Sequence, residues 1–344
     1  MKTKAVILVA LNKPLEIEEI EIPTLKPGQV LVRLLFSGLC GSQLGEIAGK
    51  RGKDRYLPHL LGHEGSGIVK ETGPQVAKVC KGDYVVCSWI KGKGLDVSST
   101  TYALGKTRIQ AGAITTLSQY SVVSENRVFK IPKSIPPPVA ALLGCAVPTG
   151  AGIIKNELKL NGKNSLAIFG VGGIGSSALL YAKALGCSPI IAVDIHDSKL
   201  RFAKKLGATF TLNAARQEVF SSVMKWTSGK GIDFAMEASG SKQAMEQAFA
   251  AIHSQGTVIL AGNLPFQEKI EINPFELIQG KKIFGTWGGK TKPDLDIPFY
   301  AGQYLKKQLP LRQLITQIYP LDEIASAFND LKRGKVIRAL VDCR

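Results

Sequence analysis

The feature that most constrains the fold of this chain is the stretch GVGGIG, from Gly170 to Gly175. The apolar run before it predicts a buried strand, and residues 174–186 after it have the spacing of a helix that ends at a glycine. A G-x-G-x-x-G pattern between a strand and a helix is typical of dinucleotide binding. Its first glycine permits a tight turn, its second lets a pyrophosphate approach, and its third lets the helix pack on the strand.

The alternation of strand and helix patterns continues on both sides of this loop, from residue 147 to about residue 287. Buried runs and helix patterns follow one another at 165–169, 174–186, 189–195, 198–208, 231–240, 241–256 and 256–263. Such alternation is typical of a parallel, doubly wound sheet with helices on both faces. The predicted fold class is therefore α/β, with a Rossmann domain at 147–287.

Asp194 stands at the end of the second buried run, at the spacing expected for a carboxylate that accepts hydrogen bonds from the adenosine ribose. Its negative charge would repel a 2′-phosphate, so the sequence favours NAD(H) over NADP. Lys199 and Arg201 follow closely and weaken that preference.

The first 146 residues have a different pattern, with short strand-like runs separated by glycine and proline turns. Such runs predict an antiparallel, partly barrel-like β domain. Residues 320–342 read as one helix followed by one strand that could return to this domain. The predicted division is therefore 1–146 with 288–344, against 147–287.

Charge and cysteine content narrow the function classes. The net charge is +17, but the basic residues are spread over many clusters, with no aromatic-interleaved basic motif, so nucleic-acid binding is disfavoured. An anionic substrate is compatible with this charge. The six cysteines form no dense framework, the N-terminal segment reads as a first strand, and no run is long enough for a membrane span. We expect a soluble cytoplasmic protein.

Candidate metal ligands are distant from one another in the sequence. Cys40 lies between glycines, His63 and Glu64 stand at the mouth of a predicted strand, and Cys145 follows an apolar helix pattern. Two thiolates and an imidazole would leave one position open, as in a catalytic zinc site. Spacing alone does not bring these residues together, and a buried cysteine without chemistry is the alternative for Cys40.

The segment GHEGSGIVKETGPQV at 62–76 matches the zinc signature of a known family, and CGS precedes it while a cysteine follows it before the GVGGIG loop. The chain resembles the zinc-dependent medium-chain dehydrogenases/reductases, the alcohol and polyol dehydrogenase family, over essentially its whole length. This resemblance implies a GroES-like catalytic domain beside the Rossmann domain.

The resemblance also implies roles for single residues. Cys40, His63 and Cys145 would ligate one catalytic Zn²⁺, Glu64 would lie beside the metal and enter its coordination, and Ser42 would pass on the alcohol proton. Trp89 would line the substrate pocket, and Arg338 would reach the cofactor's pyrophosphate. Further cofactor contacts are expected from Thr149, Gly170, Val171, Gly172, Gly173, Ile174, Gly175, Asp194 and Lys199.

Three positions depart from the family pattern. The segment 90–108 lacks the four cysteines of a structural zinc site, so no second zinc is expected. Gln43 stands where many relatives have an aspartate that orients the zinc-binding histidine; its amide could still hydrogen-bond His63. Gly45 replaces a relay histidine, so the proton's exit from Ser42 is open between cofactor ribose hydroxyls, His59 and water.

The implied function is reversible hydride transfer between NAD(H) and an alcohol, polyol or sugar-derived hydroxyl and its carbonyl partner, in a homodimer or homotetramer. Two alternatives stay open. One is a reductase of an activated C=C or C=N bond on the same fold, and the other is a nucleic-acid- or anion-binding protein with a vestigial nucleotide fold.

Overall fold

Contacts within the backbone divide the chain into two units. The first comprises Met1–Pro148 and Lys292–Arg344, and the second comprises Thr149–Thr291. The computed structural model describes all residues from 1 to 344. The sequence placed the two boundaries after residues 146 and 287.

The second unit is built on a six-stranded parallel sheet in the order β13-β12-β11-β14-β15-β16. Its strands are β11 (Leu166–Phe169), β12 (Ile190–Asp194), β13 (Phe210–Asn213), β14 (Ile232–Glu237), β15 (Ile252–Leu260) and β16 (Lys282–Gly285). Its helices are α4 (Gly173–Ala184), α5 (Asp197–Leu206), α6 (Val219–Trp226), α7 (Lys242–Ala251) and α8 (Pro274–Ile278). They follow α3 (Ala146–Gly152), which begins in the first unit and ends in the second, and a π-helical turn (Ile153–Glu157). The predicted Rossmann-type sheet is confirmed.

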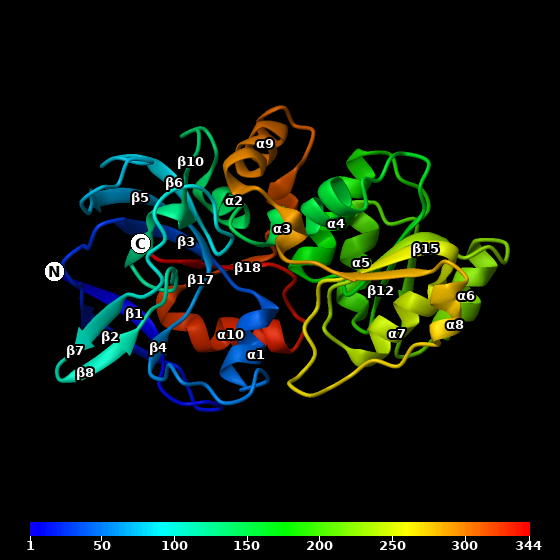
Figure 1. Cartoon of the computed structure of the whole chain (residues 1–344), viewed down its shortest axis with the longest axis horizontal. Helices are drawn as coiled ribbons and strands as arrows, with labels where there is room; N and C mark the ends of the chain where they lie inside the picture. Colours follow the sequence, from blue (N-terminus) through cyan, green and yellow to red (C-terminus); the bar gives the residue numbers. More distant parts are fainter. The chain divides into compact units, whose positions relative to one another are not determined.

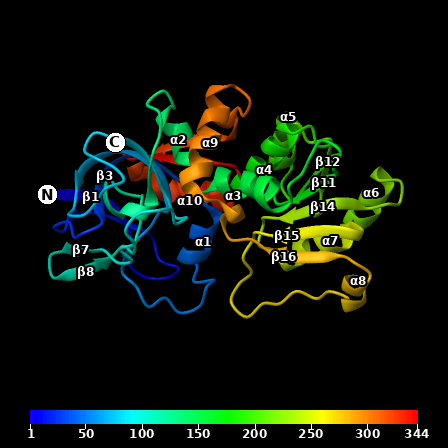
Figure 2. The same ribbon diagram turned by 45° about the horizontal axis from the view of Figure 1, so that its top comes forward.

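The order of the strands decides where the helices lie. From β11 the chain moves outward through β12 to β13 and then returns to β14 on the other side of β11. Because parallel crossovers are right-handed, α4 and α5 cover one face and α6 and α7 the other, as Figure 2 shows. The α6–α7 face is closed by apolar side chains that include Val223 and Phe249.

One predicted helix is too long. The pattern at 241–256 predicts a helix throughout, but α7 ends at Ala251 and β15 begins at Ile252. The backbone of Ile252 is extended, with φ −78° and ψ 150°, and pairs in register with Ile232. A β-branched residue buried beside a strand therefore overrides the local helix pattern.

The first unit contains two β-sheets. A closed five-stranded barrel joins β1-β2-β7-β8-β4, and a second sheet runs β10-β6-β5-β3-β18-β17, with β9 also paired to β3. The barrel strands are β1 (Lys2–Leu8), β2 (Glu16–Glu21), β4 (His59–Leu60), β7 (Thr101–Leu104) and β8 (Thr107–Gln110). The other strands are β3 (Gln29–Gly38), β5 (Glu64–Thr72), β6 (Tyr84–Ser88), β9 (Tyr120–Ser124), β10 (Val128–Lys130), β17 (Gln317–Pro320) and β18 (Ala339–Asp342). Figure 1 shows the barrel strands grouped around the N-terminus.

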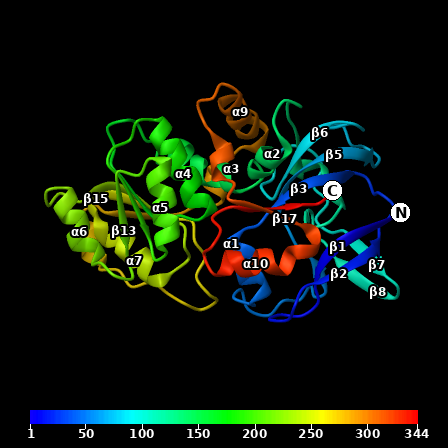
Figure 3. The ribbon, with the colours of Figure 1, turned by 180° about the vertical axis from the view of Figure 1, so that it is seen from behind.

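Helices of the first unit pack beside these sheets. They are α1 (Gly41–Ile47), α2 (Pro137–Leu142), α9 (Pro293–Leu305) and α10 (Ile324–Lys332). The expected return of the C-terminal segment is confirmed, because β18 pairs antiparallel with β3, with Leu340 opposite Gly38. Helix α10 then lies beside α1, as Figure 3 shows. The last strand of the chain thus reaches the segment that leads to Cys40.

Sequence patterns missed the β7–β8 hairpin, β17 and α9, whose short or mixed segments carry little periodicity. No helix of the structure is long and apolar enough to cross a membrane.

Candidate functional site

The structure brings three of the predicted metal ligands together. Candidate ligand atoms of Cys40, His63 and Cys145 all lie within 4.8 Å of one another. Cys40 immediately precedes α1, His63 lies between β4 and β5, and Cys145 lies between α2 and α3. All three belong to the first unit. The fold therefore assembles from distant segments the cluster that spacing alone could not predict.

Close backbone approach at Gly144 lets the Cys145 segment reach the cluster. A Cβ on Gly144 would lie 2.4 Å from the carbonyl oxygen of Cys87 and 2.7 Å from the Cβ of Glu64. Any larger residue would push Cys145 away from β5 and β6. Glycine is therefore required here by contact rather than by an unusual backbone angle.

Glu64 holds the segments that carry the other two ligands. Its side chain is fully buried and forms an ion pair with Arg338, whose Nη1 donates a hydrogen bond to the carbonyl oxygen of Leu39 at 2.6 Å. The amide of Ala146 donates to Glu64 Oε2 at 3.4 Å. Glu64, next to His63, is thus linked to a neighbour of Cys40 and a neighbour of Cys145.

This arrangement bears on two predicted roles. Glu64 is turned to Arg338 and is not part of the three-residue cluster, and Arg338 is only 2% exposed. Burial lowers the pKa of Arg338 to about 10, so the guanidinium stays charged at neutral pH. The entry of Glu64 into metal coordination and the contact of Arg338 with pyrophosphate stay predictions.

Gln43 acts on Cys40 rather than on the histidine. Its buried side chain accepts a hydrogen bond from the Cys40 amide at 2.8 Å and caps the start of α1. Its Nε2 has no hydrogen-bond partner in the structure. The hydrogen bond to His63 that such an amide could form is absent, and the amide oxygen accepts from the helix N-terminus instead.

Ser42 and His59 are the residues considered for proton transfer. Ser42 is half-buried within the first turn of α1. His59 is buried; its Nε2 contacts Asp54 Oδ2 at 2.9 Å, and its Nδ1 contacts the carbonyl oxygen of Leu60 at 2.9 Å. Both ring nitrogens already have oxygen partners, so His59 links the loop after α1 to β4.

The donor set fits a zinc ion. The Cys145 side chain, with His63 and Arg338, holds the pKa of the Cys40 thiol well below its ordinary value, although burial acts in the opposite direction. A thiolate is the form that binds metal. Zinc takes Cys sulfur at about 2.3 Å and His nitrogen at about 2.0–2.1 Å. His63 keeps partial exposure, which is compatible with access for a fourth ligand.

The glycine loop of the second unit fits a dinucleotide. Gly170 has φ +87°, and a Cβ on Gly175 would lie 2.1 Å from the carbonyl oxygen of Gly170. Around Gly172, by contrast, a Cβ would meet nothing within 4 Å. Gly172 precedes α4 as its N-cap residue and provides no side-chain cap, so its open space and the amides of Gly173 and Ile174 suit a phosphate group.

Asp194 lies against this loop. Its Oδ2 accepts a hydrogen bond from the Val171 amide at 2.9 Å, and its Oδ1 accepts one from the His196 amide at 3.0 Å. Lys199 Nζ lies 3.9 Å from Asp194 Oδ2. Thr149 is buried in the same unit, and its Oγ1 has no hydrogen-bond partner. These groups fit the predicted cofactor site; their contacts with NAD(H) stay predictions.

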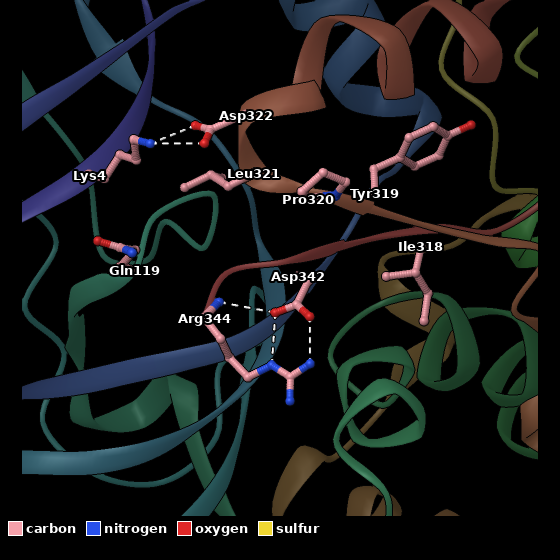
Figure 4. Close-up of a pocket in the computed structure, with 9 residues that line it drawn as sticks. All are labelled: Lys4, Gln119, Ile318, Tyr319, Pro320, Leu321, Asp322, Asp342 and Arg344. Carbon is pink, nitrogen blue, oxygen red and sulfur yellow. Dashed lines mark hydrogen bonds and ion pairs between the residues drawn. The ribbon is translucent and has the colours of Figure 1, made fainter.

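Trp89 and a pocket of the first unit are two further features. Trp89 is half-buried, and its carbonyl oxygen accepts a hydrogen bond from Arg127, so its role in the pocket stays a prediction. Figure 4 shows a pocket of about 610 Å³ on the first unit, between β1 and β17, that none of the candidate ligands lines. Its charges pair with each other, Lys4 with Asp322 and Arg344 with Asp342, both within 2.7 Å.

Comparison with known proteins matches both units. Residues 26–133 match the alcohol dehydrogenase GroES-like domain, and residues 173–299 match the zinc-binding dehydrogenase family.

Solved structures of similar proteins span the whole chain. Benzyl alcohol dehydrogenase from Acinetobacter calcoaceticus is 29% identical, with a TM-score of 0.91 and full coverage of both chains. An alcohol dehydrogenase zinc-binding domain protein from Burkholderia ambifaria is 29% identical, with a TM-score of 0.91 over 99% of both chains. The 2R,3R-butanediol dehydrogenase from Bacillus subtilis is 25% identical, with a TM-score of 0.78 over 99% of both chains.

These proteins share with this chain an architecture that runs from end to end. The chain belongs to the zinc-binding medium-chain alcohol dehydrogenase family.

Proposed function

We propose that this protein is a zinc- and NAD(H)-dependent oxidoreductase that interconverts an alcohol, polyol or sugar-derived hydroxyl and its carbonyl partner. The observation that carries this proposal is the cluster of Cys40, His63 and Cys145, whose candidate ligand atoms lie within 4.8 Å. Three protein ligands leave one position for a substrate oxygen or water, which is the arrangement of a catalytic zinc.

Metal binding, proton transfer and cofactor binding fall to different residues of this chain. When bound, zinc supplies a Lewis acid and the nicotinamide supplies the hydride donor or acceptor. Cys40, His63 and Cys145 would hold the metal. Ser42 would accept the proton of the substrate hydroxyl while passing its own hydroxyl proton onward to a cofactor ribose hydroxyl, His59 or water. In the second unit, Gly172 leaves room for the pyrophosphate, and Asp194 accepts hydrogen bonds from the adenosine ribose.

Removal of a ligand should remove the metal. Purified wild-type protein should contain about one zinc per chain by elemental analysis. Cys40→Ala and His63→Ala should contain almost none, because two remaining ligands hold zinc weakly, and both should still bind NADH. Cys80→Ala is the matched control, since Cys80 is exposed and outside the cluster. Wild-type zinc content in Cys40→Ala would contradict the assignment.

Activity tests the reaction class. A panel of primary and secondary alcohols, polyols and sugar alcohols, with and without anionic groups, should include substrates that yield NADH. Chelation should abolish that activity and added zinc should restore it. Activity that survives complete chelation, or reduction of activated double bonds without any alcohol oxidation, would instead favour the reductase on the same fold.

The choice of cofactor should depend on Asp194. Ile195 beside it is 60% exposed, so Ile195→Arg can place a cation near a 2′-phosphate. Asp194→Gly combined with Ile195→Arg should shift the ratio of kcat/KM values toward NADP by about tenfold or more, since a hydrogen bond to a charged group contributes about 1.5–3 kcal/mol. Ile195→Arg alone is the control and should shift it less. A wild-type preference for NADP would show that the role given to Asp194 is wrong.

We also propose that the chain forms a homo-oligomer, a dimer or tetramer, and resides in the cytoplasm; six free cysteines are compatible with a reducing compartment. Support for self-association comes from β16, an edge strand with one neighbour. Phe284 on this strand and Trp287 after it leave 52% and 80% of their surface exposed. Unpaired edges with exposed apolar side chains are sites of strand pairing.

Sedimentation velocity checks this proposal. Wild-type protein should sediment as a dimer or tetramer, and Phe284→Lys should shift it toward a smaller species, because a charge on the edge opposes pairing. Phe220→Lys is the control, since Phe220 is 49% exposed on α6. A wild-type monomer would refute self-association.

A further inference from the structure

Glu237 is a fully buried carboxyl group at the end of β14. In the sheet it pairs with Phe169, the last residue of β11 before the glycine loop. On the other side of β11, β12 ends at Asp194. The strand that leads to the dinucleotide fingerprint is therefore flanked by two strands that each end in a carboxylic acid.

One oxygen of Glu237 accepts hydrogen bonds from three donors in the turn that follows β14. Oε1 accepts hydrogen bonds from the Ser239 amide at 2.5 Å, the Ser239 hydroxyl at 2.5 Å and the Gly240 amide at 2.8 Å. The backbone carbonyl oxygen of Glu237 accepts hydrogen bonds from the amides of Ala261 at 2.7 Å and Gly262 at 3.2 Å. A single residue thus connects the turn 238–241 with the segment after β15.

The same turn lies directly against the glycine loop at residues 170–175. A Cβ on Gly170 would lie 2.7 Å from the Ser239 nitrogen and 2.8 Å from the Ser239 Cβ. The Ala238 amide donates to the carbonyl oxygen of Phe169 at 2.8 Å. Behind the turn, a Cβ on Gly262 would lie 2.2 Å from the Gly240 nitrogen. The turn therefore has no space to shift without moving the glycine loop.

The second oxygen of Glu237 has a different environment. Oε2 is buried without a hydrogen-bond partner, and a Cβ on Gly262 would lie 2.5 Å from it. Burial raises the pKa of Glu237, although the bonds from Ser239 and Gly240 oppose that change.

The order of the strands indicates which half of a bound dinucleotide would lie near this turn. Dinucleotides bind across the point where the strand order reverses, here between β11 and β14. With Asp194 on the adenosine side, the other nucleotide extends over the end of β14. We propose that Glu237 is a positioning residue for the nicotinamide half of the cofactor, because it holds the turn 238–241 against Gly170. This inference rests on the proposed NAD(H)-dependent function.

Calorimetric titration with NADH and with AMP, the adenosine half of the cofactor, tests the role. In Glu237→Ala the three donors of the turn lose their acceptor, so NADH should bind about tenfold more weakly or worse, equivalent to about 1.4 kcal/mol. AMP should bind as it does to the wild type. Glu237→Gln keeps an acceptor oxygen for these donors, so it should restore NADH affinity. Glu237→Asp, one methylene shorter, should give an intermediate loss and serves if the alanine variant does not fold.

Asp233→Asn is the matched control, because Asp233 lies at the opposite end of the same strand and accepts the Ser165 amide at 2.7 Å. It should leave both affinities unchanged. Equal weakening of NADH and AMP in the Glu237 variants, or unchanged NADH affinity in a folded alanine or aspartate variant, would overturn the inference. Wild-type protein that binds neither ligand would instead overturn the proposed cofactor, which separates the two claims.

Discussion

The buried ion pair between Glu64 and Arg338 is the contact on which the metal site depends. Both side chains are almost completely buried, so neither has water to replace its partner. Loss of one partner from such a pair costs about 3–5 kcal/mol, because the other charge stays buried and unpaired. Arg338 precedes β18, the C-terminal strand that pairs with β3, so the end of the chain holds the segment before Cys40 in place.

Both units position functional groups by carboxylates that accept backbone amides. Glu64 accepts a hydrogen bond from the amide of the residue after Cys145, and Asp194 accepts one from an amide of the glycine loop. Glu237 accepts one from an amide of the turn beside that loop. Hydrogen bonds of this kind fix a backbone more tightly than neutral ones when the acceptor is charged. The backbone around the metal cluster and the glycine loop is therefore positioned by carboxyl groups that need not contact a substrate.

Much of the fold could be predicted from local patterns. The glycine fingerprint between a strand and a helix predicts the parallel sheet, and the C-terminal helix and strand patterns are compatible with the observed pairing of β18 with β3. The end of α7 could not be predicted, because Ile252 follows a helix pattern yet pairs with β14. Local periodicity does not contain that tertiary contact.

The candidate site, too, could be predicted only in part from the sequence. Resemblance to the family brought Cys40, His63 and Cys145 together, and the structure agrees. The partner of Gln43 could not be predicted, since a glutamine at that position can reach either a helix N-terminus or a neighbouring histidine. The role of Glu237 had no sequence signal of its own, because one acidic residue at a strand end is common.

Zinc K-edge X-ray absorption of the zinc-loaded protein tests whether two thiolates and one imidazole of this chain form a catalytic zinc site. We expect two sulfur ligands at about 2.3 Å, one histidine nitrogen at about 2.0–2.1 Å and one further light atom. A shell of four sulfurs, or one without sulfur, would contradict it.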